Sequence, residues 1–206
     1  MSIPYGQDEI RAKIVLCGPS QAGKASFLRH LGKLLAPAGE AKVAELRTND
    51  DRILTLDALP DDLPLVDGRR MRLSIVTATG PVHHESTWAG LSTGADAVIF
   101  LADSRVERAL DNAKTIRVLR HAMQLEGVDE STLPIVVAFN HRTDGATVAD
   151  VDIRRSLNLT ELPSFSVGAD DGHGILAAFT AVVRAVFESL GRGLGEAAAR
   201  SLGALK

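Results

Sequence analysis

One stretch near the N-terminus has the residue types and spacing of a phosphate-binding loop. An apolar run over residues 14–17 is followed by Gly18, and then by Gly23 and Lys24. Glycines at these two positions let the backbone turn so that successive N–H groups point inward. A helix that begins near Lys24 adds the positive end of its dipole, and the lysine ammonium can reach the outer phosphates of a nucleotide. The stretch therefore predicts a nucleotide phosphate site.

The residue that follows the lysine departs from this chemistry. A Ser or Thr at this position supplies the hydroxyl that binds Mg²⁺, and here the residue is Ala25. Ser26 comes next, but one step along a helix turns a side chain by about 100°, so we do not expect its hydroxyl to reach the same ion. Ser26 is therefore only a weak candidate magnesium ligand.

The elements that position this loop alternate between strands and helices. Buried strands with uniformly apolar sequences predict a mostly parallel α/β sheet with helices on both faces. The antiparallel edge is expected from a hairpin that joins residues 53–59 to residues 71–76. The expected strands are residues 14–17, 43–46, 53–59, 71–76, 97–102, 134–139 and 165–167, and the expected helices are residues 24–35, 106–125, 148–157 and 175–190.

Composition limits the class of protein. The chain has 206 residues, a formal net charge of -3 and one cysteine, Cys17, which we expect to be an apolar filler of the first strand. This charge gives no general attraction to nucleic acid, and no apolar run reaches the length of a membrane span. We expect a soluble cytoplasmic protein with one domain over residues 1–190. We expect residues 191–206 to be a flexible or helical tail that starts with a glycine-rich joint.

The order of several separated motifs resembles the MglA family, bacterial Ras-like small GTPases of cell polarity and gliding motility. The resemblance runs from Met1 to about Leu190. The motifs that carry it are Gly18-Pro19, Asp51-Arg52-Ile53-Leu54 before Asp57-Ala58-Leu59-Pro60, and residues 97–104, which end in Ala-Asp-Ser. The resemblance implies a Ras-like P-loop fold and a guanine nucleotide. It also implies a protein partner at the switch segments, of the roadblock-fold MglB type.

The same resemblance assigns roles to residues of the two switch segments. Arg52 matches the arginine that the family inserts from its own chain to stabilise the transition state. Ile53 takes the place of the switch threonine, and Thr55 is a weak substitute as a metal ligand. Gly80 is retained and its amide can contact a γ-phosphate, but Pro81 replaces the glutamine that orients the attacking water. Proline has no side-chain hydrogen-bonding group and no N–H, so it cannot take that role.

Guanine selection in the family depends on an Asn-Lys-x-Asp motif, which is altered here. Asn140 is retained, His141 replaces the lysine, Thr143 takes the place of the aspartate, and Asp144 is one residue late. Ala169 falls in the final base-contacting loop, where its amide can meet the base. The nucleotide-binding residues expected from all these arguments are Gly18, Gln21, Ala22, Gly23, Lys24, Ala25, Ser26, Gly80, Asn140, Asp144 and Ala169.

Partner binding is expected at the switch surface. Its candidate residues are Arg52, Ile53, His83, His84 and Trp88. Trp88 is expected either to fill the core beneath the second switch or to anchor an interface, and the interface is favoured. Neighbouring histidines on a loop usually point apart, so His83 and His84 do not predict a metal site.

The residues for magnesium binding, water positioning and guanine selection are altered, whereas the apolar framework is intact. This combination predicts a pseudo-GTPase that binds partner proteins. It would hold GTP or GDP weakly or no cofactor at all, with Mg²⁺ binding doubtful. Two alternatives stay open. One is a slow but active GTPase that uses Ser26, Arg52 and Asp144 from shifted positions. The other, ranked lower, is an ATP-using P-loop enzyme.

Overall fold

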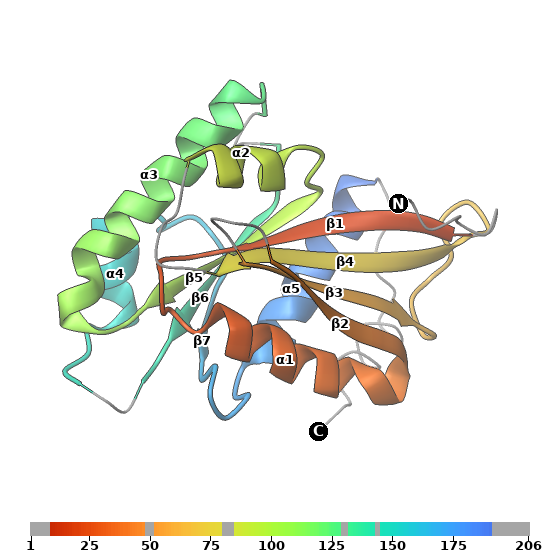
Figure 1. Cartoon of the computed structure of the whole chain (residues 1–206), viewed down its shortest axis with the longest axis horizontal. Coiled ribbons are helices and arrows are strands. Elements are labelled where there is room, and N and C mark those ends of the chain that lie inside the picture. Colours follow the sequence, from red (N-terminus) through yellow and green to blue (C-terminus); the bar gives the residue numbers. More distant parts are fainter. Residues whose placement is uncertain (1–8, 48–51, 80–84, 129–131, 143–144, 191–206) are drawn as a thin grey trace.

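A seven-stranded sheet forms the centre of the protein. The computed structural model describes residues 9–47, 52–79, 85–128, 132–142 and 145–190. The strand order is β2-β3-β4-β1-β5-β6-β7 (Figure 1). The strands are β1 (Glu9–Cys17), β2 (Gly39–Arg47), β3 (Arg52–Pro60), β4 (Arg70–Thr79), β5 (Ala97–Asp103), β6 (Ile135–Asn140) and β7 (Ser164–Val167).

The directions of the strands confirm a mostly parallel sheet with an antiparallel edge. β1 pairs in parallel with β4 and β5, and the parallel ladder continues through β6 to β7. β3 runs antiparallel to both β4 and β2, so the expected hairpin is present. β2 is longer than the four residues expected and forms the outer edge beyond β3, where most of its side chains are exposed.

Helices cover both faces of the sheet. They are α1 (Lys24–Leu35), α2 (Glu85–Ser92), α3 (Ala109–Leu125), α4 (Asp150–Ser156) and α5 (Ile175–Ser189). Ile14 and Leu16 of β1 pack into the core with α1 and α5, whereas Val15 and Cys17 pack into the core with α2, α3 and α4 (Figure 1). This alternation follows from the two-residue period of a strand. None of the helices in the described part of the chain is long and apolar enough to span a membrane.

Two features of the α2–α3 side differ from the sequence prediction. α2 was not predicted, and the helix expected over residues 106–125 is divided into a 3₁₀ turn, η2 (Val106–Arg108), and α3. Trp88 of α2 is completely buried, in one apolar cluster with Phe100 and Leu119. Its expected role as an exposed interface anchor is therefore wrong, because the indole fills the core beneath α2. Cys17 is buried in the same cluster, and burial raises the pKa of its thiol to about 12.

Candidate nucleotide site

The loop between β1 and α1 is closely packed at both glycines. A Cβ atom at Gly18 would lie 2.3 Å from the carbonyl oxygen of Leu101 on β5. Gly23 has a φ of 92°, and a Cβ atom there would lie 2.6 Å from Nδ2 of Asn140 and 2.8 Å from Cβ of Ala169. Only glycine fits such close approaches, and the left-handed conformation of Gly23 also favours it. These contacts fix the path of the loop against β5 and against the loops that follow β6 and β7.

Lys24 is held inside this loop. Its ammonium donates hydrogen bonds to the carbonyl oxygens of Gly18, at 2.7 Å, and of Pro19, at 2.6 Å. The side chain is only 3% exposed. Burial lowers the pKa of Lys24 to about 8, so most of the lysine is charged at neutral pH. Lys24 also begins α1. The first turn of this helix has no acidic residue, so no carboxylate competes with a bound anion for the N–H groups there.

A second cation, Arg108 of η2, lies against the same loop and was not predicted. Its guanidinium donates to the carbonyl oxygen of Ser20 and forms an ion pair of 2.8 Å with Asp111. The topology explains this contact: β5 is the parallel neighbour of β1, so the segment that follows β5 emerges beside the loop that follows β1. Two positive groups therefore contact the backbone of the loop, one from its own helix and one from η2.

Asn140, at the end of β6, joins two loops of the site. Its Nδ2 donates to the carbonyl oxygen of Ala22 at 2.9 Å, and its Oδ1 accepts from the amide of Ala169 at 2.8 Å. Ala169 was expected to offer that amide to a base, whereas in the structure the amide donates to Asn140. The Ala169 carbonyl oxygen lies 3.0 Å from Nδ1 of His30 on α1. Asn140 therefore holds the phosphate loop and the last loop together.

The rest of the expected base site is only partly described. His141 is exposed, and its Nε2 lies 2.8 Å from a carboxylate oxygen of Asp150. The other carboxylate oxygen of Asp150 accepts a hydrogen bond from Ser166. Asp144 lies outside the described residues, as do Gly80, His83 and His84.

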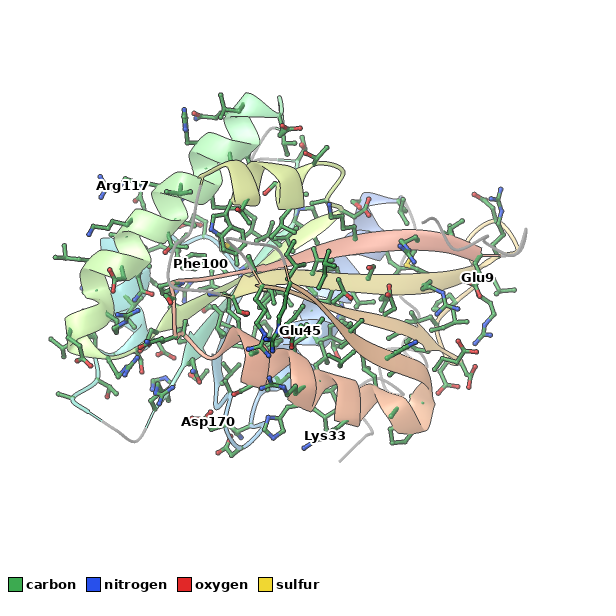
Figure 2. All side chains as sticks on the ribbon, in the orientation of Figure 1. Glu9, Lys33, Glu45, Phe100, Arg117 and Asp170 are labelled. Atoms are coloured by element: carbon green, nitrogen blue, oxygen red, sulfur yellow. The ribbon has the colours of Figure 1, made fainter. Side chains whose placement is uncertain are left out.

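Arg52 forms an ion pair across the edge of the sheet. Its Nη2 donates to Glu45 of β2, which is labelled in Figure 2, at 2.6 Å, and the second carboxylate oxygen of Glu45 accepts from Arg47 at 2.7 Å. Hydrogen bonds from Arg52 and Arg47 lower the pKa of Glu45 to about 2. Ile53 packs against the core cluster of α2 and α3, and Thr55 lies opposite Val76 of β4. The structure thus places Arg52 and Ile53 on β3, with the side chain of Arg52 bound to the neighbouring strand.

The positions available for a metal ion offer few ligands. Ala25 is half-buried and packs against the core cluster of α1 and α5, and Ser26 follows it in the first turn of α1. Gln21 is exposed and has a left-handed backbone, with a φ of 62°. Within the described ranges, no three His, Cys, Asp or Glu side chains form a group that could hold a metal.

The glycine-bounded loop, its inward lysine and the sheet order define a P-loop protein of Ras-like fold. No protein-family model matches the chain. The chain is 31% identical over 191 residues to the mutual gliding-motility protein MglA of Myxococcus xanthus (strain DK1622), which covers 93% of this chain and 98% of that protein. At this identity and coverage, the chain belongs to the MglA family of Ras-like small GTPases.

Proposed function

We propose that this MglA-family protein is a pseudo-GTPase of the cell-polarity and gliding-motility type. In this proposal it retains a site for the phosphates of a guanine nucleotide, lacks the groups for efficient hydrolysis, and binds partner proteins through its switch surface. The observation that carries the proposal is the contrast at the phosphate loop. The Lys24 ammonium is held inside the loop by two hydrogen bonds. The next residue, which should supply a hydroxyl for Mg²⁺, is Ala25, and its side chain is a methyl group.

The residues of the loop fit a phosphate chain better than they fit a magnesium ion. The first N–H groups of α1 have no partners within the helix, and Lys24 and Arg108 add positive charge beside them. The Ala25 side chain has no oxygen to offer a cation, and Ser26 lies about 100° further around the helix. We therefore expect nucleotide to bind with little dependence on Mg²⁺.

The groups that would promote hydrolysis are altered or engaged elsewhere. Pro81 cannot orient a water molecule, because it has neither a side-chain donor nor an N–H. Arg52 is paired with Glu45, so an arginine finger would first have to break that ion pair. These features support a protein that does not hydrolyse nucleotide rapidly. Its switch surface would then change when a nucleotide or a partner binds, and not through repeated hydrolysis.

A slow GTPase is the second candidate, and the exposure of Arg52 favours it. The Arg52 side chain is 40% exposed. An ion pair at such a surface is weak, so Arg52 can leave Glu45 when a nucleotide offers a stronger negative charge. This candidate requires turnover that depends on both Arg52 and Lys24.

We propose a protein partner at the switch surface, which includes Arg52 and Ile53 on β3. A roadblock-fold dimer of the MglB kind is the partner that family membership favours. Trp88 supports this surface from beneath, since it is buried under α2 and does not face a partner.

The test begins with the nucleotide content of freshly purified protein, identified by chromatography after denaturation. GDP, GTP and ATP are then titrated with and without Mg²⁺, and hydrolysis is followed as phosphate release. We expect GDP or GTP to bind similarly with and without Mg²⁺ and to be hydrolysed no faster than the buffer blank. The Ala25→Ser variant should gain magnesium dependence, while Ser26→Ala, the matched control, should not change the dependence of binding on Mg²⁺.

Two results would reject the proposal, and a third would limit it to a partner-binding scaffold. Magnesium-dependent turnover that is lost in both Arg52→Ala and Lys24→Ala would identify a slow GTPase. Stabilisation by ATP alone would identify an ATP-using protein. If the folded protein responded to no nucleotide, the proposed phosphate site would be rejected. Only the proposed role as a partner-binding scaffold would then remain.

A further inference from the structure

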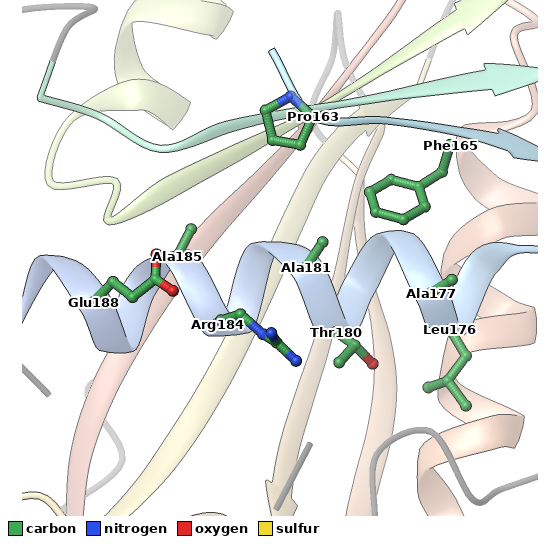
Figure 3. Close-up of a pocket in the computed structure, with 9 residues that line it drawn as sticks. All are labelled: Pro163, Phe165, Leu176, Ala177, Thr180, Ala181, Arg184, Ala185 and Glu188. Atoms are coloured by element: carbon green, nitrogen blue, oxygen red, sulfur yellow. The ribbon is translucent and has the colours of Figure 1, made fainter. Parts of the chain in front are cut away.

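A groove of about 570 Å³ lies along α5 beside β7, on a part of the protein that the nucleotide site does not use (Figure 3). One wall is a stripe of small side chains on α5, Ala177, Ala181 and Ala185. The other wall includes Phe165 of β7, and Leu176 closes the end at the start of α5. β7 is the last strand of the sheet, so the groove lies at an edge of the sheet.

We propose that residues 191–206 of this chain fold back as a helix antiparallel to α5 and occupy this groove. The segment starts at the correct place, because α5 ends at Ser189 and Glu188 of its last turn lines the groove. Residues 191–195 are Gly-Arg-Gly-Leu-Gly, a length and composition suited to a connection between antiparallel helices.

The length of the remaining segment matches the groove. Residues 196–206 would form a helix of about 16 Å at 1.5 Å per residue. Along α5, the lining residues from Leu176 to Glu188 span about 18 Å by the same rise. Alanine, the best helix former, occupies positions 197–199 and 204. An isolated helix of this length is unstable in water, so its formation would depend on the groove.

The side chains of the segment complement the groove in size. Ala198, Leu202 and Leu205 have helical spacing, so a helix places them on one face. Leucines on that face fit against the small side chains of α5.

Disulfide trapping in the full chain tests this docking. Ala181→Cys is combined in turn with a cysteine substitution at each position from 198 to 206. Native Cys17 is fully buried with a pKa of about 12, so it should not react in the folded protein. We expect monomeric disulfides at positions three or four residues apart, such as Leu202→Cys and Leu205→Cys. These should form at least about tenfold faster than at the intervening positions, because docking fixes one face against α5.

The matched control replaces Ala181→Cys with Arg117→Cys, an exposed position on α3 on the other side of the sheet (Figure 2). Equal trapping from both positions, or trapping without periodicity along the tail, would overturn the proposal. Concentration-dependent disulfide dimers would also overturn it, because the occupant would then be a second copy of the chain.

Limited trypsin digestion tests the same docking without cysteines. Arg192 lies in the glycine-rich joint and Arg200 lies in the proposed helix, so docking should make cleavage after Arg200 about tenfold slower than after Arg192. Ala177 is exposed at the far end of the groove, and Ala177→Trp should block docking and make the two rates similar. Equal cleavage in the unsubstituted protein would refute the proposal.

Discussion

Removal of the Asn140 side chain tests how the two loops of the nucleotide site are held together. Asn140 is 1% exposed, and its amide group bonds to the carbonyl oxygen of Ala22 and the amide of Ala169. The Asn140→Ala substitution leaves both of these backbone groups without their partner. An unsatisfied buried group costs about 1–3 kcal/mol, and water that enters the space recovers part of this, so we expect a loss of about 2–4 kcal/mol in unfolding free energy.

Asn112 offers a matched control elsewhere in the same core. Its Oδ1 accepts from the Asp103 amide at 3.0 Å and its Nδ2 donates to the Asp103 carbonyl oxygen at 2.8 Å. Asn112→Ala therefore removes the same side chain and the same number of backbone contacts, but it does not release Ala22 from Ala169. The two variants should lose similar stability, whereas only Asn140→Ala should also lose affinity for GDP.

Urea unfolding of nucleotide-free protein, together with calorimetric titration of GDP, measures both quantities. A loss of less than about 1 kcal/mol in Asn140→Ala would mean that water replaces both hydrogen bonds, and the reasoning would fail. Equal losses of GDP affinity in the two variants would also refute it, because the effect would then follow general stability and not the link between the loops.

Two further predictions concern buried side chains. Because the pKa of Lys24 is lowered to about 8 from 10.5 in the folded protein, the unfolded chain binds more protons between these values. The free energy of unfolding should therefore rise with pH from about 8 to 10.5. Affinity for phosphate should fall over the same range, because Lys24 loses its charge. The Lys24→Met variant should show neither trend in urea and binding titrations. Trp88→Ala should cost about 3–5 kcal/mol because it empties a fully buried site. In the unsubstituted protein, the emission of this single tryptophan should shift to longer wavelength on unfolding, and an emission maximum typical of exposed indole in the native state would contradict its burial.

The sequence predicted those parts of the fold in which apolar pattern decides structure. The strands now numbered β5 and β6 are continuous apolar runs, and both are buried along their whole length. α2 has no comparable signal, because its eight residues include Ser, Thr and Gly, and Trp88 and Leu91 are the only large apolar side chains in it. Its position is set by packing of the indole against the sheet, which a local pattern does not contain.

The candidate site was predictable only in its local part. The phosphate loop is a continuous stretch, so its glycines and Lys24 could be read from spacing. The contact of Arg108 with Ser20 joins residues 88 positions apart, and that of Asn140 with Ala22 joins residues 118 positions apart. Such contacts depend on the order of parallel strands, and no sequence spacing reports them.

The described contacts explain how, in the proposed pseudo-GTPase, the site would keep its architecture while the residues for hydrolysis change. Lys24 bonds to its own loop, and Asn140 joins two loops, so both stabilise the folded protein whether or not a nucleotide binds. A hydroxyl at position 25 would act only on a magnesium ion, and a glutamine in place of Pro81 would act only on an attacking water. Residues that serve the fold and the ligand together are costly to replace, whereas residues that serve only hydrolysis can change without loss of structure. The pattern of retained and altered residues in this chain follows that division.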